Sequence, residues 1–258
     1  MTSDFIPILF NTPNSYEQIE IYFAHDIHYG SAQFDNLKWE KIKQEIMSQP
    51  NRYVICVGDY CENAVVGSKS DIYTQVYPPH IQKEWLTNQF YELKDRIIAI
   101  VPGNHENNRI TRVCGLYPVY DCAVSVGIQD RYRQHFAIVD IGVGKSKKRK
   151  NSQFRYFGYV THKLKDCKNY CGSDFVEGID FSVFGHDHAP KDQPRGKLVY
   201  DNKKKIVTQK DIETIDSGSC MTYGGYAVDN GYRPNSSKTY KLICDGKEKR
   251  ITSVGYHL

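Results

Sequence analysis

The chain has no apolar run close to the roughly 20 residues that a membrane-spanning helix needs, so no membrane span is expected. Its first residues, Met1-Thr2-Ser3-Asp4, contain neither the basic nor the apolar stretch of a secretory signal, which favours a cytoplasmic location. Internal repeats and long linkers are also absent. We therefore expect residues 1–258 to form a single domain.

Cysteines with the spacing of a metal or disulfide framework are missing. The eight cysteines include no C-x-x-C pair, which argues against a zinc ribbon, and they are too sparse for a disulfide scaffold. Cys167 and Cys171 lie near each other, and a chance pair is a simpler interpretation than a metal or redox pair. Reduced thiols in a cytoplasmic protein fit this usage best. The net charge of +4 permits an anionic substrate without selecting one.

What the sequence does contain is a series of short, apolar, β-branched runs, each ending in a polar cluster. Continuous apolar runs bounded by turn residues are typical of buried strands in α/β proteins. The runs cover residues 19–24, 53–57, 96–101, 154–160 and 181–184.

Between the first three runs, apolar residues recur at helical spacing. Strand–helix–strand–helix–strand is the order expected for a mainly parallel sheet. The helical positions are Phe34, Leu37, Ile42 and Ile46 in the first segment, and Ile81, Trp85, Leu86, Phe90 and Leu93 in the second.

The last third of the chain has a different pattern. Residues 197–209 and 239–256 alternate in polarity, and Asp201-Asn202 and Asp245-Gly246 supply hairpin signals. We predict that the region of about residues 190–258 forms a second, more antiparallel sheet packed on the first. The predicted fold is an α/β two-sheet sandwich flanked by helices.

Side chains that bind metal ions gather at the carboxyl ends of these runs, where open α/β sheets place their sites. Mixing histidine with aspartate and asparagine suits manganese, iron or zinc ions that also bind phosphate and water oxygens. The residues concerned are five of the nine histidines (28, 105, 162, 186 and 188) together with Asp26, Asp59 and Asn104.

Hydrolysis of a phosphoester is a reaction that needs such a set. The ester repels an incoming hydroxide, and its leaving oxygen departs with negative charge. Two cations about 3.5–4 Å apart can bind the phosphate oxygens, acidify a bridging water and neutralise the developing charge. The pair needs a bridging carboxylate and several further ligands on loops that converge in space.

Five motifs, in order and each after an apolar run, resemble those of the calcineurin-like metallophosphoesterase family. They cover about residues 19–188. They are D-x-H at Asp26-Ile27-His28, G-D-x-x-[DE] at residues 58–62, G-N-H-[ED] at residues 103–106, an isolated histidine at His162, and G-H-x-H at residues 185–188. The resemblance implies the αββα fold of that family and metal-dependent hydrolysis of phosphoesters.

The resemblance also implies two metal positions that share Asp59 as a bridging ligand. The remaining ligands of one ion would be Asp26, His28 and His188, and those of the other Asn104, His162 and His186. The ions are expected to be manganese, with iron, zinc or nickel as alternatives.

His105 would be the catalytic residue of such a site. The resemblance places it over the substrate, where it would stabilise the phosphate and protonate the leaving oxygen as a general acid. The attacking group would be a hydroxide that bridges the metals. Arg109 would either contact a substrate phosphate with its fork of donors or be a surface residue.

Other residues near the motifs have two interpretations each. His162 depends mainly on its place after a strand, and the alternative ligand is His135, which would lie at the opposite end of a strand. His25 would point away from Asp26, which favours a structural role over metal binding. Glu62 would either orient the catalytic histidine or be a solvated loop residue.

The substrate is less constrained. Protein Ser/Thr phosphatases of the family carry G-D-x-x-D-R-G, whereas Glu62 is followed here by Asn63-Ala64. Family nucleases usually carry a further DNA-binding or coiled-coil extension, for which 258 residues leave no room. We predict a compact phosphodiesterase or nuclease acting on nucleotides or nucleic acids, similar to small stand-alone bacterial and phage members. A phosphomonoesterase or protein phosphatase of the same fold is the alternative.

Two further segments bear on that prediction. The basic cluster at residues 145–150 is either a solvated loop or a nucleic-acid contact. Tyr223, Tyr226 and Tyr232 either pack around the second sheet or stack on bases. A third possibility, a metal-binding scaffold without catalysis, predicts missing ligands or a missing His105, and none is missing.

Overall fold

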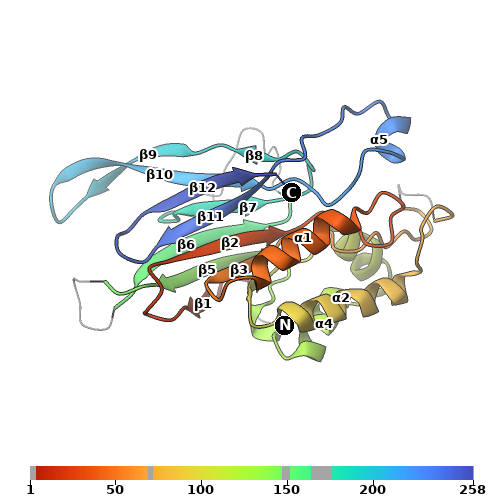
Figure 1. Cartoon of the computed structure of the whole chain (residues 1–258), viewed down its shortest axis with the longest axis horizontal. Coiled ribbons are helices and arrows are strands. Elements are labelled where there is room, and N and C mark those ends of the chain that lie inside the picture. Colours follow the sequence, from red (N-terminus) through yellow and green to blue (C-terminus); the bar gives the residue numbers. More distant parts are fainter. Residues whose placement is uncertain (1–3, 69–71, 147–151, 164–175, 258) are drawn as a thin grey trace.

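The structure is a computed structural model that describes residues 4–68, 72–146, 152–163 and 176–257. Two sheets of mixed strand direction pack face to face, with helices flanking them (Figure 1). Most of the basic cluster, from Lys147 to Lys150, and the pair Cys167 and Cys171 lie outside the described residues.

The first sheet has five strands in the order β12-β11-β2-β3-β4. β2, β3 and β4 run parallel, and the hairpin β11–β12 adds to β2 antiparallel. The strands are β2 (Gln18–Ala24), β3 (Arg52–Cys56), β4 (Ile97–Ile100), β11 (Thr239–Asp245) and β12 (Ile251–Tyr256).

The second sheet has seven strands in the order β1-β5-β6-β7-β10-β8, with β9 paired to β10. β6, β7 and the end of β10 run parallel to one another. The strands are β1 (Ile8–Asn11), β5 (Phe136–Val143), β6 (Phe154–Thr161), β7 (Phe181–Phe184), β8 (Lys191–Asp192), β9 (Arg195–Asp201) and β10 (Ile206–Asp216).

Three helices cover the outer face of the first sheet (Figure 1), and shorter turns connect the remaining elements. The covering helices are α1 (Asn36–Met47), α2 (Pro79–Leu93) and α4 (Pro118–Val126). The shorter elements are the π-helix η1 (His105–Thr111), α3 (Arg112–Cys114), the 3₁₀ turn η2 (Gln129–Arg131) and α5 (Tyr226–Asp229).

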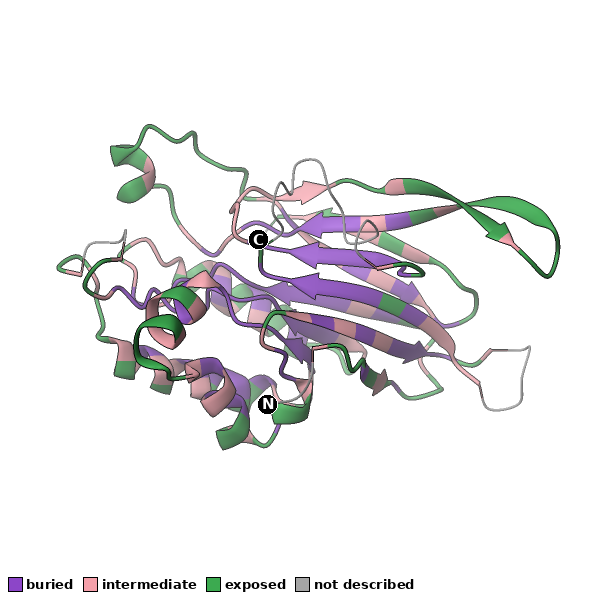
Figure 2. Ribbon diagram, turned by 180° about the vertical axis from the view of Figure 1, so that it is seen from behind, coloured by how far each residue is buried: buried purple, intermediate pink, exposed green. Residues whose placement is uncertain are grey.

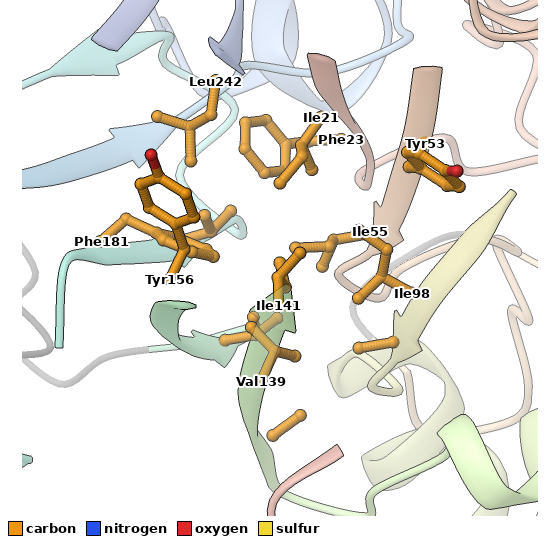
Figure 3. Close-up of a cluster of buried hydrophobic side chains, with 14 of the residues drawn as sticks. Ile21, Phe23, Tyr53, Ile55, Ile98, Val139, Ile141, Tyr156, Phe181 and Leu242 are labelled. Carbon is orange, nitrogen blue, oxygen red and sulfur yellow. The ribbon is translucent and has the colours of Figure 1, made fainter. Parts of the chain in front are cut away.

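Alternation along the strands explains why the first sheet has apolar residues on both faces. Ile21 and Phe23 of β2 point into the core between the sheets, where they belong to the same buried cluster as Val139 and Phe181 of the second sheet (Figure 3). Tyr22, between them, points the other way into the core beneath the helices. Burial on both faces therefore requires an uninterrupted apolar run. Figure 2 shows the buried central strands and the exposed outer half of the β9–β10 hairpin.

The prediction that residues 190–258 would supply the second sheet is confirmed for β8, β9 and β10, which belong to that sheet, and was wrong for the C-terminal hairpin. That sheet is built around β5, β6 and β7, and the C-terminal hairpin β11–β12 joins the first sheet instead. The reason is that Leu242 and Cys244 of β11 bury their side chains in the core between the sheets, next to β2. Alternation within a segment indicates that it is a strand, but it does not specify the neighbouring strand.

The apolar runs all form strands and both helical segments form helices, but Phe34 lies before the start of α1 and one further position differs. Trp39, Ile42 and Ile46 make up its buried side, whereas Leu37 is 76% exposed. None of the described helices is long and apolar enough to cross a bilayer. The cytoplasmic location and the single-domain organisation stay predictions from the sequence.

The packing between the sheets predicts a large difference between two leucines. Leu242→Ala removes a side chain that is 0% exposed and should lower the free energy of unfolding by about 2–5 kcal/mol. Leu37→Ala, on the exposed side of α1, is the matched control and should change it by less than about 0.5 kcal/mol. Urea denaturation followed by circular dichroism measures both. Similar losses for the two variants would contradict the observed core.

Candidate metal site

The predicted ligands come together where the carboxyl ends of strands from both sheets meet. Main-chain hydrogen bonds continue past the strand ends, from Asp26 N to Gly58 O in the first sheet and from Gly185 N to His162 O in the second. The loops therefore leave their strands in fixed directions. Three groups have ligand atoms within 4.8 Å of one another: Asp26, His28 and His188; His28, Asp59 and His105; and Asp59, His162 and His186.

Asp26, which is fully buried, uses its two carboxylate oxygens differently. Oδ2 accepts hydrogen bonds from His25 Nδ1 at 2.6 Å and from the main-chain N of His186 at 2.9 Å. Oδ1 has no hydrogen-bond partner and lies 3.2 Å from His188 Nε2 and 3.8 Å from His28 Nε2. An orphaned, buried carboxylate oxygen that faces imidazole nitrogens fits a cation position.

Asp59 lies between the outer groups. Its Oδ1 accepts a hydrogen bond from the main-chain N of His105 at 2.8 Å, and its Oδ2 lies 3.2 Å from His162 Nε2 and 3.9 Å from His28 Nε2. Gly103 is needed for this arrangement, because a Cβ at that position would overlap the Asp59 side chain. Oδ2 is thus placed to contact ions on either side.

Hydrogen bonds orient two of the buried histidines, His28 and His162, with Nε2 toward the carboxylates. His28 Nδ1 lies 3.1 Å from a carboxylate oxygen of Glu62, and His162 Nδ1 lies 2.7 Å from the carbonyl oxygen of Val57. Fixing one ring nitrogen in this way leaves the other available as a ligand. His162 Nε2 also lies 3.1 Å from Asn104 Oδ1.

The charges of the site shift the pKa values of these groups. Burial alone would lower the pKa of His28, but the neighbouring carboxylates of Asp26, Glu62 and Asp59 raise it to about 10. Burial acts likewise on His162, and Asp59 raises its pKa to about 9. Burial would raise the pKa of Asp59, yet the neighbouring histidines hold it far below its ordinary value. The carboxylates thus stay charged only beside positive groups, a role that divalent ions also fill.

The main chain is strained at these loops. Left-handed φ angles, which non-glycine residues rarely adopt, cost about 1–3 kcal/mol each and cluster at functional sites. Five of the predicted ligands have them: Asp26 (47°), His28 (53°), Asp59 (50°), His186 (79°) and His188 (56°).

Glu106 ties two of the loops together. It is buried, and its carboxylate accepts hydrogen bonds from the main-chain N–H groups of Asp59, Cys61 and Gly103 at 2.8–3.1 Å. Burial, and then the charge of Asp59, raise the pKa of Glu106 to about 7. The loop after β3 and the loop after β4 therefore hold a common geometry through one side chain.

His105 lies at the start of η1 and forms a pair with Arg109 one turn later. Its Nδ1 lies 2.9 Å from the main-chain oxygen of Glu62, and its Nε2 lies 2.7 Å from Arg109 Nη2. The Glu62 carboxylate lies 2.9 Å from Arg109, 3.1 Å from His28 Nδ1 and 3.8 Å from His105 Nδ1, so it is not a solvated residue. Arg109 is thus held inside the site rather than on the surface. Burial, with His28 and Arg109, lowers the pKa of His105 to about 4.

The alternative residues lie elsewhere. His135 is exposed and pairs with Asp4 at 2.7 Å, away from the carboxylates. Asp187, between His186 and His188, turns outward to Lys191 at 3.1 Å. Of the two candidate histidines, the structure thus places His162 and not His135 beside the carboxylates.

The tyrosines after Cys220 do not pack around a sheet. Tyr223, Tyr226 and Tyr232 are each about half exposed. Their segment is attached to the loop after His28, because Thr222 N donates to Gln33 O at 2.8 Å.

Sequence analysis overlooked the segment after β10, which also reaches the site. The Ser217 hydroxyl contacts His25 at 2.5 Å, and Asp216 is buried beside it. The signal in the sequence is weak, because β10 is mostly polar and only Ile212 and Ile215 are apolar among the five residues before Ser217.

Two histidine variants test which of the two candidate histidines, His162 or His135, binds a metal ion. His162→Ala removes a nitrogen that faces Asp59 and Asn104, and should weaken Mn²⁺ binding by at least about tenfold. His135→Ala, on the surface, should leave binding unchanged. Isothermal titration of Mn²⁺ into metal-stripped protein measures both affinities. Full affinity in the His162 variant would remove His162 from the ligand set.

The chain was compared with known protein families, curated proteins and solved structures. No curated protein matches the chain. Among solved structures, a metallophosphoesterase from Sphaerobacter thermophilus is similar with 12% identity and a TM-score of 0.42, covering 93% of this chain and 89% of that one. The family model described as calcineurin-like phosphoesterase matches residues 20–190, well over half of the chain. The chain therefore belongs to the calcineurin-like phosphoesterase family and is a metal-dependent phosphoester hydrolase.

Proposed function

We propose that this hydrolase is a dinuclear phosphodiesterase or nuclease that acts on nucleotides or nucleic acids, with manganese as its preferred ion. The observation that carries the two-ion proposal is the central place of Asp59, whose Oδ2 faces His162 on one side and His28 on the other. Asp26 and His188 would complete the site on the His28 side. The ligands of the other ion would be Asn104, His162 and His186.

The ligand chemistry supports manganese. Imidazole, carboxylate and amide donors without a thiolate suit ions such as Mn²⁺. Bound there, two such ions would supply charge for the phosphate oxygens and would lower the pKa of a water molecule.

The chain's own residues would then position the substrate. Arg109 is aimed at His105 and carries N–H donors that can contact a phosphate oxygen. The negative charge of a bound phosphate would raise the pKa of His105 from its low value, which is what protonation of the leaving oxygen by Nε2 requires.

The charge of the site favours a diester over a monoester. Arg109 is paired with Glu62 at 2.9 Å, so its positive charge is already compensated. A diester carries one negative charge, whereas a monoester near neutral pH carries up to two and needs more uncompensated positive groups. The half-exposed tyrosines at 223, 226 and 232 add aromatic surface on a segment attached to the site loop, which supports a nucleotide substrate.

The substrate class is tested with matched reporters. The Mn²⁺-loaded protein should hydrolyse bis-p-nitrophenyl phosphate with a higher kcat/KM than p-nitrophenyl phosphate, because the site compensates one charge better than two. Single-stranded DNA and cyclic nucleotides are then compared as natural diesters. A clear preference for the monoester would overturn the diesterase proposal and leave the phosphoesterase family intact.

The leaving group tests the role of His105. His105→Ala should lower kcat by about 10²–10⁴-fold for a dinucleotide, whose alkoxide must be protonated as it leaves. The loss should be much smaller for bis-p-nitrophenyl phosphate, because p-nitrophenolate leaves without a proton. Mn²⁺ binding measured by titration calorimetry should be unchanged. Equal losses on both substrates would contradict the general-acid role.

A further inference from the structure

A hydrogen-bonded chain of side chains runs from the second sheet to the first predicted ligand. Ser217, directly after β10, contacts His25 Nε2 through its hydroxyl at 2.5 Å. His25, directly after β2, contacts Asp26 Oδ2 through Nδ1 at 2.6 Å. All three side chains are buried. The chain therefore joins the edges of two different sheets beneath the metal site.

The direction of each hydrogen bond follows from the groups involved. A charged carboxylate can only accept, so Nδ1 of His25 carries the hydrogen in its bond to Asp26. Nε2 then has a lone pair that accepts the hydroxyl hydrogen of Ser217. A neutral imidazole thus satisfies both partners, and neither ring nitrogen is left to bind a metal ion.

The hydrogen bond from His25 determines which oxygen of the Asp26 carboxylate remains available. His25 and the main-chain N of His186 together occupy Oδ2, which leaves Oδ1 as the oxygen that faces His28 and His188. Turning the carboxylate to offer both oxygens would break two hydrogen bonds in a buried place. Gly185 makes room for the pair, because a Cβ there would lie 2.5 Å from Asp26 Oδ2 and 3.1 Å from His25 Nδ1.

We propose that His25 is a positioning residue which, supported by Ser217, presents Asp26 to the metal through Oδ1 alone. This inference rests on the proposed ligand set, in which Asp26 binds one of the ions. Ser217 lies outside the segment that matches the family model, so the C-terminal part of the chain contributes to the site through His25. The order Ser–His–Asp is that of a nucleophilic triad, but here the buried hydroxyl supports a ligand instead.

Metal binding to the stripped, full-length protein is the direct test. His25→Leu keeps a similar volume without a donor, and should weaken one of the two Mn²⁺ binding events by about 10–100-fold while the other stays unchanged. His25→Asn keeps a donor near the place of Nδ1 and should recover most of the affinity. Ser219→Ala, two residues from Ser217, is the control and should bind as the unmodified protein does.

A double-mutant cycle then tests whether Ser217 acts through His25. Ser217→Ala should weaken the same binding event by a smaller factor than His25→Leu does. In the His25→Leu background it should have no further effect, because Ser217 acts only through His25. Additive losses of Mn²⁺ affinity would overturn the proposed series of hydrogen bonds, since they would mean that Ser217 acts independently of His25.

The remaining outcomes are also decisive. Unchanged Mn²⁺ affinity in a folded His25→Leu variant overturns the positioning role alone, and so does an equal weakening of both events together with a lower melting temperature. If His25→Leu fails to fold, His25→Asn is compared with His25→Gln, whose longer amide reaches toward Ser217 rather than Asp26. Stronger binding by the Gln variant overturns the proposal. An unmodified protein that binds no Mn²⁺ overturns the ligand set itself.

Discussion

Burying two carboxylates at the junction of two sheets imposes the main constraint on this molecule. Asp26 and Asp59 are almost completely removed from water, and an isolated buried charge is costly. Histidines from loops of both sheets surround the two carboxylates, and the carboxylates raise the pKa values of these histidines. These groups are kept at contact distance by hydrogen bonds to the main chain, by strained φ angles, and by glycines at positions where a Cβ atom would overlap them. Each feature is explained by the need to compensate the negative charges of the two buried carboxylates at one place.

The sandwich architecture makes that meeting possible. Apolar residues on both faces of β2, β3 and β4 bind that sheet to the helices on one side and to the second sheet on the other. Because β6 and β7 end at the same edge, His162 and the loop of His186 and His188 arrive opposite Asp26 and Asp59. Hydrogen bonds of Glu106 and Glu62 then hold the loops that carry these residues in place. The family membership identifies the result as a hydrolase rather than the inert scaffold that the sequence alone left open.

Much of this was predictable because the information is local. Each motif residue follows an apolar run, and the carboxyl ends of neighbouring strands lie together in open sheets. What escaped prediction depends on contacts between distant segments. Leu37 is an exception, because at 3.6 residues per turn it lies on the side of α1 opposite Ile42 and Ile46, and it is exposed. The Glu62 carboxylate lies closer to His28 and Arg109 than to His105, and the direction of a side chain in a loop has no sequence period. The pairing of β11 with β2 likewise depends on which apolar face remains uncovered.

The distance along the chain between the parts of the site bears on how the protein is made. Asp26 hydrogen-bonds the main chain of His186, 160 residues later, and His25 contacts Ser217, 192 residues later. Chains emerge from the ribosome from the N-terminus at about 5–20 residues per second. The D-x-H loop is therefore synthesised many seconds before the segments that it contacts. Metal binding by the proposed ligand set would have to follow assembly of the two sheets.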